Sequence, residues 1–281
     1  MQSTTPSSQS VTLNNGLQMP LLGFGVWSSP PGQETQDAVL NALDTGYRHI
    51  DTAEVYENEQ DVGSALQKWA QKSGDSDIFV TTKLTPEAKG HADTLEAFDR
   101  SLDKLQRDVI DLYLMHWPSP GSRKENWLAI EDLYASGRCR AIGVSNFTVR
   151  HLEELQGYAR VTPAVNQVEY NVYLYQKELR DYCTSKGIQL TAYSPLARMQ
   201  VSEEDRVLEI AKKYGKSKAQ VCIRWILQQG IPTFPKSVRL ARIQENFNVF
   251  DFELDREDMA ALSSLNRDYR CNPDWNPENV S

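Results

Sequence analysis

An alternation of short apolar runs with helical patterns, repeated eight times from Leu21 onward, constrains the fold more than any other feature. The predicted strands are 21–26, 47–51, 78–83, 109–116, 140–144, 164–168, 189–193 and 231–235. The predicted helices are 34–45, 59–71, 92–105, 127–135, 149–156, 177–185, 205–214, 218–229, 240–247 and 256–265. Strand-then-helix units require right-handed crossovers and a parallel sheet. Eight units in about 250 residues predict an α/β protein with a (β/α)8 TIM barrel, and an open doubly wound sheet is the alternative.

The segment before the first unit predicts an N-terminal β-hairpin. Asn14-Asn15-Gly16 lies between the short apolar runs 11–13 and 17–20, and Asn-Gly is typical of tight hairpin turns. Residues 1–10 are rich in Ser, Thr and Gln and predict a flexible tail without a signal peptide. No linker composition separates the later units, so we expect residues 11–281 to form a single barrel domain.

Composition argues against several classes of function. The net charge of −8 disfavours a general nucleic-acid binder, which needs a basic face. No apolar run reaches 18 residues, so we expect neither a spanning helix nor a membrane partner. The four cysteines form no Cys-x-x-Cys pair and the four histidines are scattered. We therefore expect free thiols in the cytoplasm and no metal site.

The C-terminal ends of the predicted strands carry ionisable side chains, and in a barrel those ends form the active site. Asp51, Lys83 and His116 end three consecutive strands, and Tyr56 lies on the loop after Asp51. Each alone has an ordinary explanation, as a turn cap, a solvated strand end or a core histidine. Spaced one strand–helix repeat apart, the four side chains should meet at one mouth of the barrel.

Such a group could donate a proton to an oxygen atom. A free tyrosine has a pKa of about 10, and the Lys83 ammonium should lower it by favouring the phenolate. Asp51 would keep Lys83 charged, and Tyr56 could then act as general acid toward a carbonyl that becomes an alkoxide. His116 could donate a hydrogen bond to the same oxygen. The reduction needs a hydride that no side chain supplies, so we predict a nicotinamide cofactor.

A basic stretch after the last predicted strand is the candidate phosphate site. Lys236, Arg239 and Arg242 lie at a strand end and helix start, where charge and helix dipole both favour phosphate. A solvated basic helix start is the alternative. Gly23-Phe24-Gly25 is not a dinucleotide fingerprint, because Ser28 replaces the third glycine and a Pro-containing loop follows. Tyr193 could stack on a flat ring.

From about residue 13 to residue 273, the chain resembles the aldo-keto reductase family, including small bacterial and protozoan members such as 2,5-diketogluconate reductase and prostaglandin F synthase. The resemblance rests on residues 46–53 with Tyr56, on 112–118, on 142–147 and on 231–246. It implies a monomeric (β/α)8 barrel that reduces carbonyls with NADPH, and a catalytic tetrad of Asp51, Tyr56, Lys83 and His116.

The resemblance also implies roles for residues around the tetrad. Ser145, Asn146 and Gln167 would hold the nicotinamide carboxamide, Tyr193 would stack on its ring, and Ser194 and Leu196 would line the pyrophosphate path. Lys236, Ser237, Arg239 and Arg242 would grip the 2′-phosphate, with Val238 in the same stretch and Glu245 and Asn246 at the adenine. Trp27 and Trp117 would wall the substrate pocket.

Departures from the larger animal members predict an open, permissive pocket. The loops after Leu196 and Trp117 are short, and the C-terminal tail lacks a long extension. Arg239 replaces a threonine of many animal members, which favours NADPH. We expect reduction of aldehydes or activated ketones. The alternatives are an NADPH-sensing regulatory subunit on the same fold and a Schiff-base aldolase that uses Lys83.

Overall fold

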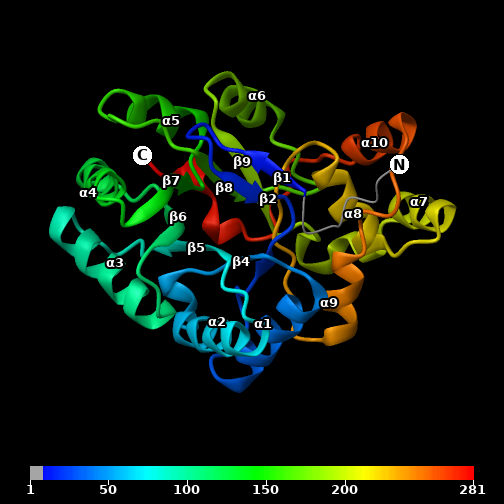
Figure 1. Ribbon diagram of the computed structural model, residues 1–281. Helices are drawn as coiled ribbons and strands as arrows, with labels where there is room; N and C mark the ends of the chain where they lie inside the picture. The colour runs from blue at the N-terminus through cyan, green and yellow to red at the C-terminus, as the bar shows by residue number, and fades with distance from the viewer. Residues whose placement is uncertain (1–8) are drawn as a thin grey trace.

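The computed structural model describes residues 9–281, with only the main chain for Ser202, as a barrel of parallel strands surrounded by helices (Figure 1). The strands are β1 (Ser10–Thr12), β2 (Gln18–Pro20), β3 (Phe24–Gly25), β4 (His49–Asp51), β5 (Phe79–Leu84), β6 (Ile110–Met115), β7 (Cys139–Ser145), β8 (Val165–Glu169) and β9 (Gln189–Tyr193). The helices are α1 (Gln33–Thr45), α2 (Glu59–Ser73), α3 (His91–Leu105), α4 (Arg123–Ala135), α5 (Val149–Gln156), α6 (Lys177–Ser185), α7 (Asp205–Tyr214), α8 (Lys218–Leu227), α9 (Leu240–Phe247) and α10 (Arg256–Ser263). Short 3₁₀ turns are η2 (Glu54–Tyr56), η3 (Ala197–Glu203), η4 (Pro273–Trp275) and η5 (Pro277–Asn279). None of these helices is long and apolar enough to cross a membrane.

The central sheet confirms the predicted barrel order. Strands β3 to β9 pair in sequence order, and every neighbouring pair is parallel. Because the strands are parallel, all their C-terminal ends open on one side, as the position of the predicted site requires. The large core cluster fills the space between these strands and the surrounding helices.

The prediction of a regular eighth strand over 231–235 is wrong. Thr233 alone bridges β9 at Ala192 and the β3 side at Leu22. The main-chain N–H of Thr233 donates to Leu21 O at 2.9 Å, and its carbonyl accepts from Gly23 at 3.0 Å. Pro232 and Pro235 flank this contact and have no N–H to extend a ladder. The barrel therefore closes through one isolated bridge on each side of Thr233, together with main-chain hydrogen bonds from Ala192 N–H to Pro232 O and from Gly25 N–H to Pro235 O.

The N-terminal hairpin is confirmed and closes the far end of the barrel. Strands β1 and β2 pair antiparallel, and Figure 1 shows them over the centre of the ring of strands. Asn14 Nδ2 donates to Pro163 O at 3.1 Å, just before β8 begins, and Met19 packs in the inner core cluster. The predicted tail is wrong at its last two residues, because Ser10 pairs in β1 and Gln9 O accepts from Leu21 N. Residues 1–8 of that prediction lie outside the described residues.

One helix begins earlier than its apolar pattern indicates. Helix α4 starts at Arg123, not at Trp127. The Arg123 side chain is buried and donates to Pro118 O at 2.8 Å, so this turn is held by a polar contact. Hydrophobic periodicity cannot reveal a helix turn of that kind.

Candidate active site

Three members of the predicted tetrad meet in one cluster, in which Asp51 and Lys83 are buried and Tyr56 is half-buried at the edge of a cavity. Asp51 ends β4, Lys83 lies near the end of β5, and Tyr56 ends the turn η2 that follows β4. Lys83 Nζ donates to Asp51 Oδ1 at 2.7 Å, to Thr52 O at 2.8 Å and to Tyr56 Oη at 3.3 Å. The ammonium therefore joins the carboxylate to the phenol.

The fourth member, His116, directly follows β6 and faces the tyrosine. Its ring centroid lies 5.6 Å from that of Tyr56, edge to face. Burial, and then the nearby Lys83 charge, hold the pKa of His116 well below its usual range. A neutral imidazole keeps one N–H donor, and the Nδ1 atom has no partner within the described chain. His116 can therefore donate a hydrogen bond but carries no charge.

The pKa of Tyr56 departs from the expectation based on its lysine neighbour. Burial, and then the Asp51 carboxylate, raise this pKa well above the usual value of a phenol. A buried phenolate would lose its hydration and face a second anion, and one ammonium at 3.3 Å does not outweigh both effects. Burial also lowers the pKa of Lys83, although Asp51 opposes that shift. The expectation of a lowered tyrosine pKa is thus wrong for this structure, and Tyr56 retains its proton at neutral pH.

A second polar group lies beside the tetrad at the ends of β7, β8 and β9. Tyr193 Oη donates to Asn146 Oδ1 at 2.7 Å, and Asn146 Nδ2 donates to His116 O at 3.1 Å. Ser145 Oγ donates to Gln167 O at 2.8 Å. Gln167 Nε2 donates to Asp51 Oδ2 at 2.7 Å. Residues predicted to hold a nicotinamide therefore form one hydrogen-bonded network with the tetrad.

A cavity of about 460 Å³ opens in front of both groups. The site residues predicted from the sequence that line this cavity are Trp27, Asp51, Tyr56, His116, Ser145, Asn146, Gln167, Tyr193, Ser194, Leu196 and Lys236. Trp27, Met199 and Trp275 are the large apolar side chains exposed at its walls. The Arg198 guanidinium lies 4.9 Å from the centroid of the Trp27 ring, so loop 197–203 reaches across to the β3 side.

The basic stretch after the barrel closure continues outward from this cavity. Lys236 Nζ donates to Ser28 O at 3.0 Å. Arg239 and Arg242 are exposed at the start of α9, and neither forms an ion pair within residues 9–281. The other residues predicted at this end of the cofactor, Ser237, Val238, Glu245 and Asn246, lie on the same stretch and do not line the cavity. Two exposed guanidinium groups are thus available beside a helix N-terminus.

Comparison with known proteins establishes the family. The model of the aldo/keto reductase family matches residues 21–267. The chain belongs to this family. It is 47% identical to glyoxal reductase of Bacillus subtilis over 98% of this chain and 99% of that protein. It is 46% identical to 9,11-endoperoxide prostaglandin H2 reductase of Trypanosoma cruzi over 96% and 95% of the two chains.

Solved structures of the family confirm the fold. An aldo-keto reductase from a deep-sea metagenome library of the Medee basin is 43% identical, with a TM-score of 0.91 over 97% of this chain and 100% of that one. A Bombyx mori aldo-keto reductase in complex with NADP is 31% identical, with a TM-score of 0.89 over 97% of each chain. The protein is therefore an oxidoreductase built as an aldo-keto reductase barrel.

The C-terminal segment of this aldo-keto reductase, residues 264–281 after α10, supplies residues of the cavity that the sequence pattern did not reveal. Asn272 and Trp275 line the cavity, and Glu169 lines it from the end of β8. The predicted pocket wall Trp117 does not line the cavity, and its ring packs edge to face on Trp275 at 5.1 Å. A tryptophan between two prolines in a polar tail is the one sequence signal that could have indicated this contact.

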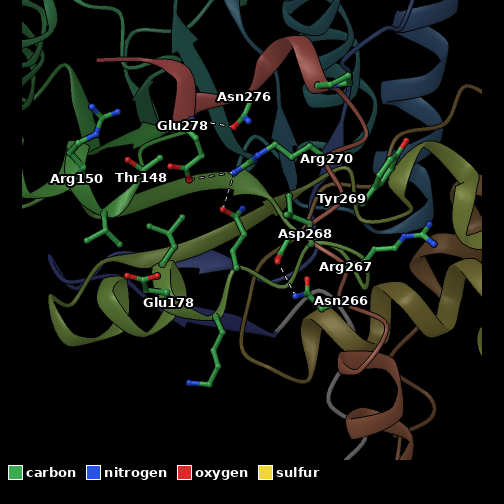
Figure 2. Close-up of a pocket in the computed structure, with 16 residues that line it drawn as sticks. Thr148, Arg150, Glu178, Asn266, Arg267, Asp268, Tyr269, Arg270, Asn276 and Glu278 are labelled. Atoms are coloured by element: carbon green, nitrogen blue, oxygen red, sulfur yellow. Dashed lines mark hydrogen bonds and ion pairs between the residues drawn. The ribbon is translucent and has the colours of Figure 1, made fainter.

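A larger hollow of about 920 Å³ lies on the other side of the C-terminal segment (Figure 2). It is bordered by the starts of α5 and α6 and by polar residues such as Arg150, Glu178 and Arg270. No tetrad residue lines it. This hollow is therefore separate from the cavity beside the tetrad. No group of three or more His, Cys, Asp or Glu side chains in the described chain could hold a metal ion.

Proposed function

We propose that this aldo-keto reductase reduces aldehydes or activated ketones to alcohols with NADPH, and that Tyr56 is the general acid. The observation that carries the proposal is the contact of Tyr56 Oη with Lys83 Nζ at 3.3 Å beside the cavity. Relatives named for the reduction of glyoxal and of a prostaglandin endoperoxide support a reductive direction.

The residues around the cavity fit a nicotinamide dinucleotide phosphate. Ser145, Asn146 and Gln167 offer amide and hydroxyl groups for the carboxamide, and Tyr193 offers a ring for stacking. Ser194 and Leu196 would follow the pyrophosphate. Lys236, Ser237, Arg239 and Arg242 would bind the 2′-phosphate, with Val238 between them and Glu245 and Asn246 near the adenine. NADPH, when bound, would supply the hydride that no side chain can provide.

The protein's own side chains would donate the proton and stabilise the charge that develops. Tyr56 holds its proton at neutral pH because burial raises its pKa, so it can donate to a carbonyl oxygen as negative charge develops there. Neutral His116 would fix that oxygen by a hydrogen bond. Lys83, held by Asp51, would stabilise the phenolate that remains. Trp27 and Trp117 would contribute to the substrate side of the pocket, directly or through Trp275.

A direct test follows NADPH absorbance at 340 nm with glyoxal and larger aldehydes. Turnover supports the proposal, whereas tight NADPH binding without turnover of any carbonyl would identify a cofactor sensor. Borohydride trapping of a carbonyl on Lys83 without NADPH would identify an aldolase. On the strength of the family resemblance, we also propose a cytoplasmic monomer that acts on a small molecule and not on nucleic acid or membrane.

Replacing Arg239 with alanine should weaken NADPH binding much more than NADH binding. A hydrogen bond to a charged group contributes about 1.5–3 kcal/mol, so KM for NADPH should rise roughly tenfold to a hundredfold. NADH has no 2′-phosphate, so its KM should change little. Arg256 on α10 is an exposed arginine away from the cavity, and Arg256→Ala is the matched control. Equal losses for the two cofactors in Arg239→Ala would contradict the phosphate assignment.

The plot of kcat/KM against pH should show no inflection near pH 6.5, the usual pKa of histidine. The pKa of His116 is lowered, so the ring stays neutral as the pH falls through that value. The pKa of Tyr56 is raised, so its proton is not lost in the alkaline range of an ordinary phenol. The pKa of Lys83 is lowered, so activity should decline on the alkaline side as this ammonium deprotonates. Steady-state kcat/KM measured across pH checks this, and an acidic limb that disappears in His116→Gln would contradict it.

A further inference from the structure

Glu169 is a buried carboxylate with no part in the tetrad. It ends β8, is 1% exposed and lies two residues beyond Gln167, on the strand face that points into the barrel. It lines the cavity, and no ion pair of the described residues includes it. A buried carboxylate without a cation is costly unless hydrogen bonds stabilise it, so its donors are informative.

The donors connect β8 to the C-terminal segment. Glu169 Oε1 accepts from the main-chain N–H of Cys271 at 2.8 Å and from Asn171 Nδ2 at 3.5 Å. The Glu169 carbonyl accepts from Gln176 Nε2 at 2.5 Å, and Gln176 Oε1 accepts from Arg270 at 3.4 Å. Figure 2 shows the Arg270 side chain extending toward Glu278. Glu169 thus holds the chain at the point where it enters the cavity wall.

The residues that follow Cys271 form this wall. Asn272 and Trp275 line the cavity, and the Trp275 ring lies 6.0 Å from that of His116 and 5.1 Å from that of Trp117. Within the described chain, residues 272–276 form hydrogen bonds only among themselves and with nearby residues of the C-terminal segment. The next hydrogen bond to the barrel is at Val280, whose carbonyl lies 3.1 Å from His151 Nε2. The hydrogen bonds that hold the stretch around Trp275 to the barrel are therefore those at Cys271 before it and at Val280 after it.

We propose that Glu169 is a positioning residue for substrate, which fixes Trp275 beside the reactive side chains through the Cys271 N–H. This inference rests on the proposed carbonyl reduction. A carbonyl compound with an aromatic substituent would extend from His116 and Tyr56 to Trp275, where ring packing adds affinity. Glyoxal has no substituent and would not depend on that wall. Glu169 thereby sets the preference for bulky over small carbonyl substrates.

The test compares glyoxal with phenylglyoxal, which differs by one phenyl ring. In Glu169→Ala, KM for phenylglyoxal should rise by up to about tenfold, the usual contribution of one aromatic pair. Its kcat should change less than its KM, and the KM for glyoxal should rise less than the KM for phenylglyoxal, since packing of the phenyl ring is the interaction lost. Glu169→Gln keeps an oxygen acceptor and should restore most of the wild-type KM. An equal rise in KM for both substrates would overturn the proposal.

Trp275 provides a second criterion. In a Trp275→Ala background, adding Glu169→Ala should change KM for phenylglyoxal little, because the side chain that Glu169 positions is gone. If Glu169→Ala does not fold, Cys271→Pro removes the same N–H and should reproduce its effect. Cys271→Ser keeps the N–H and also a side-chain donor toward Glu169, to which the Cys271 thiol is hydrogen-bonded, and should behave as wild type. Independent, additive losses at the two positions would overturn the proposal.

A measurement without turnover separates this inference from the proposed function. Amide hydrogen exchange in the C-terminal segment around Cys271 should be faster in Glu169→Ala than in the wild type, with no substrate or cofactor present. If the wild type reduces no carbonyl, the proposed function fails while the exchange result still reports on the contact. Unchanged exchange and an unchanged ratio of the two KM values would together refute the positioning role.

Discussion

Replacing Tyr56 with phenylalanine should lower kcat for carbonyl reduction about 100- to 10,000-fold, the usual contribution of general acid catalysis. The phenol is the protonated group that Lys83 contacts beside the cavity, and the substitution removes only its hydroxyl. The Kd for NADPH should remain close to that of the wild type. Stopped-flow turnover and fluorescence titration of NADPH measure the two quantities separately.

Tyr158→Phe is the matched control for this substitution. Its hydroxyl is buried without a hydrogen-bond partner in the described chain, and it lies outside the cavity. The same chemical change there should leave kcat unaltered. If Tyr56→Phe also turned over at a near wild-type rate, another group would have to donate the proton, and the assignment would fail.

Replacing Lys83 with methionine should reduce both stability and turnover. Lys83 is fully buried and Asp51 is 5% exposed, so the substitution leaves a buried carboxylate without its cation. Removing one partner of a buried pair typically costs about 3–5 kcal/mol of unfolding free energy. Turnover should fall as well, because the phenolate of Tyr56 loses its stabilising charge. Urea unfolding at neutral pH and steady-state kinetics measure both effects.

Two comparisons distinguish this effect from a general loss of charge. The Lys72–Asp44 pair is exposed, so Lys72→Met should cost no more than about 1 kcal/mol. Adding Asp51→Asn to Lys83→Met should recover much of the lost stability, because the unpaired charge disappears, but it should not recover activity. A double variant as unstable as Lys83→Met would show that the buried charge is not the cause.

The meeting of the four side chains of the predicted tetrad could be predicted because the barrel repeats. Asp51, Lys83 and His116 lie at the C-terminal ends of successive strands, and parallel strands bring these ends to one side whatever the details of packing. The eighth strand could not be predicted from its apolar run, because Pro232 and Pro235 remove the donors that a ladder needs. The apolar run therefore identified residues 231–235 as the segment that closes the barrel, but it did not predict how that segment is hydrogen-bonded.

The remaining errors concern quantities that depend on three-dimensional surroundings. The pKa of Tyr56 is raised because burial outweighs the effect of the lysine neighbour that the strand spacing predicted. Trp275 reaches the cavity because the C-terminal segment crosses the barrel mouth, and no periodic pattern encodes that path. The pocket is therefore less open than the sequence predicted where Asn272 and Trp275 form its wall.

The hydrogen bond from Gln167 Nε2 to Asp51 Oδ2 couples the residues proposed to hold the nicotinamide to the group proposed to donate the proton. Asp51 divides its two oxygens between Lys83 and Gln167. An amide has a limited set of donors and acceptors, so any partner that Gln167 gains on one side changes what it offers to the carboxylate. Substitutions at Gln167 and Lys83 should therefore be non-additive in free energy. A ligand bound to the Gln167 amide would change the electrostatic effect of Lys83 on Tyr56 without contacting Lys83 or Tyr56.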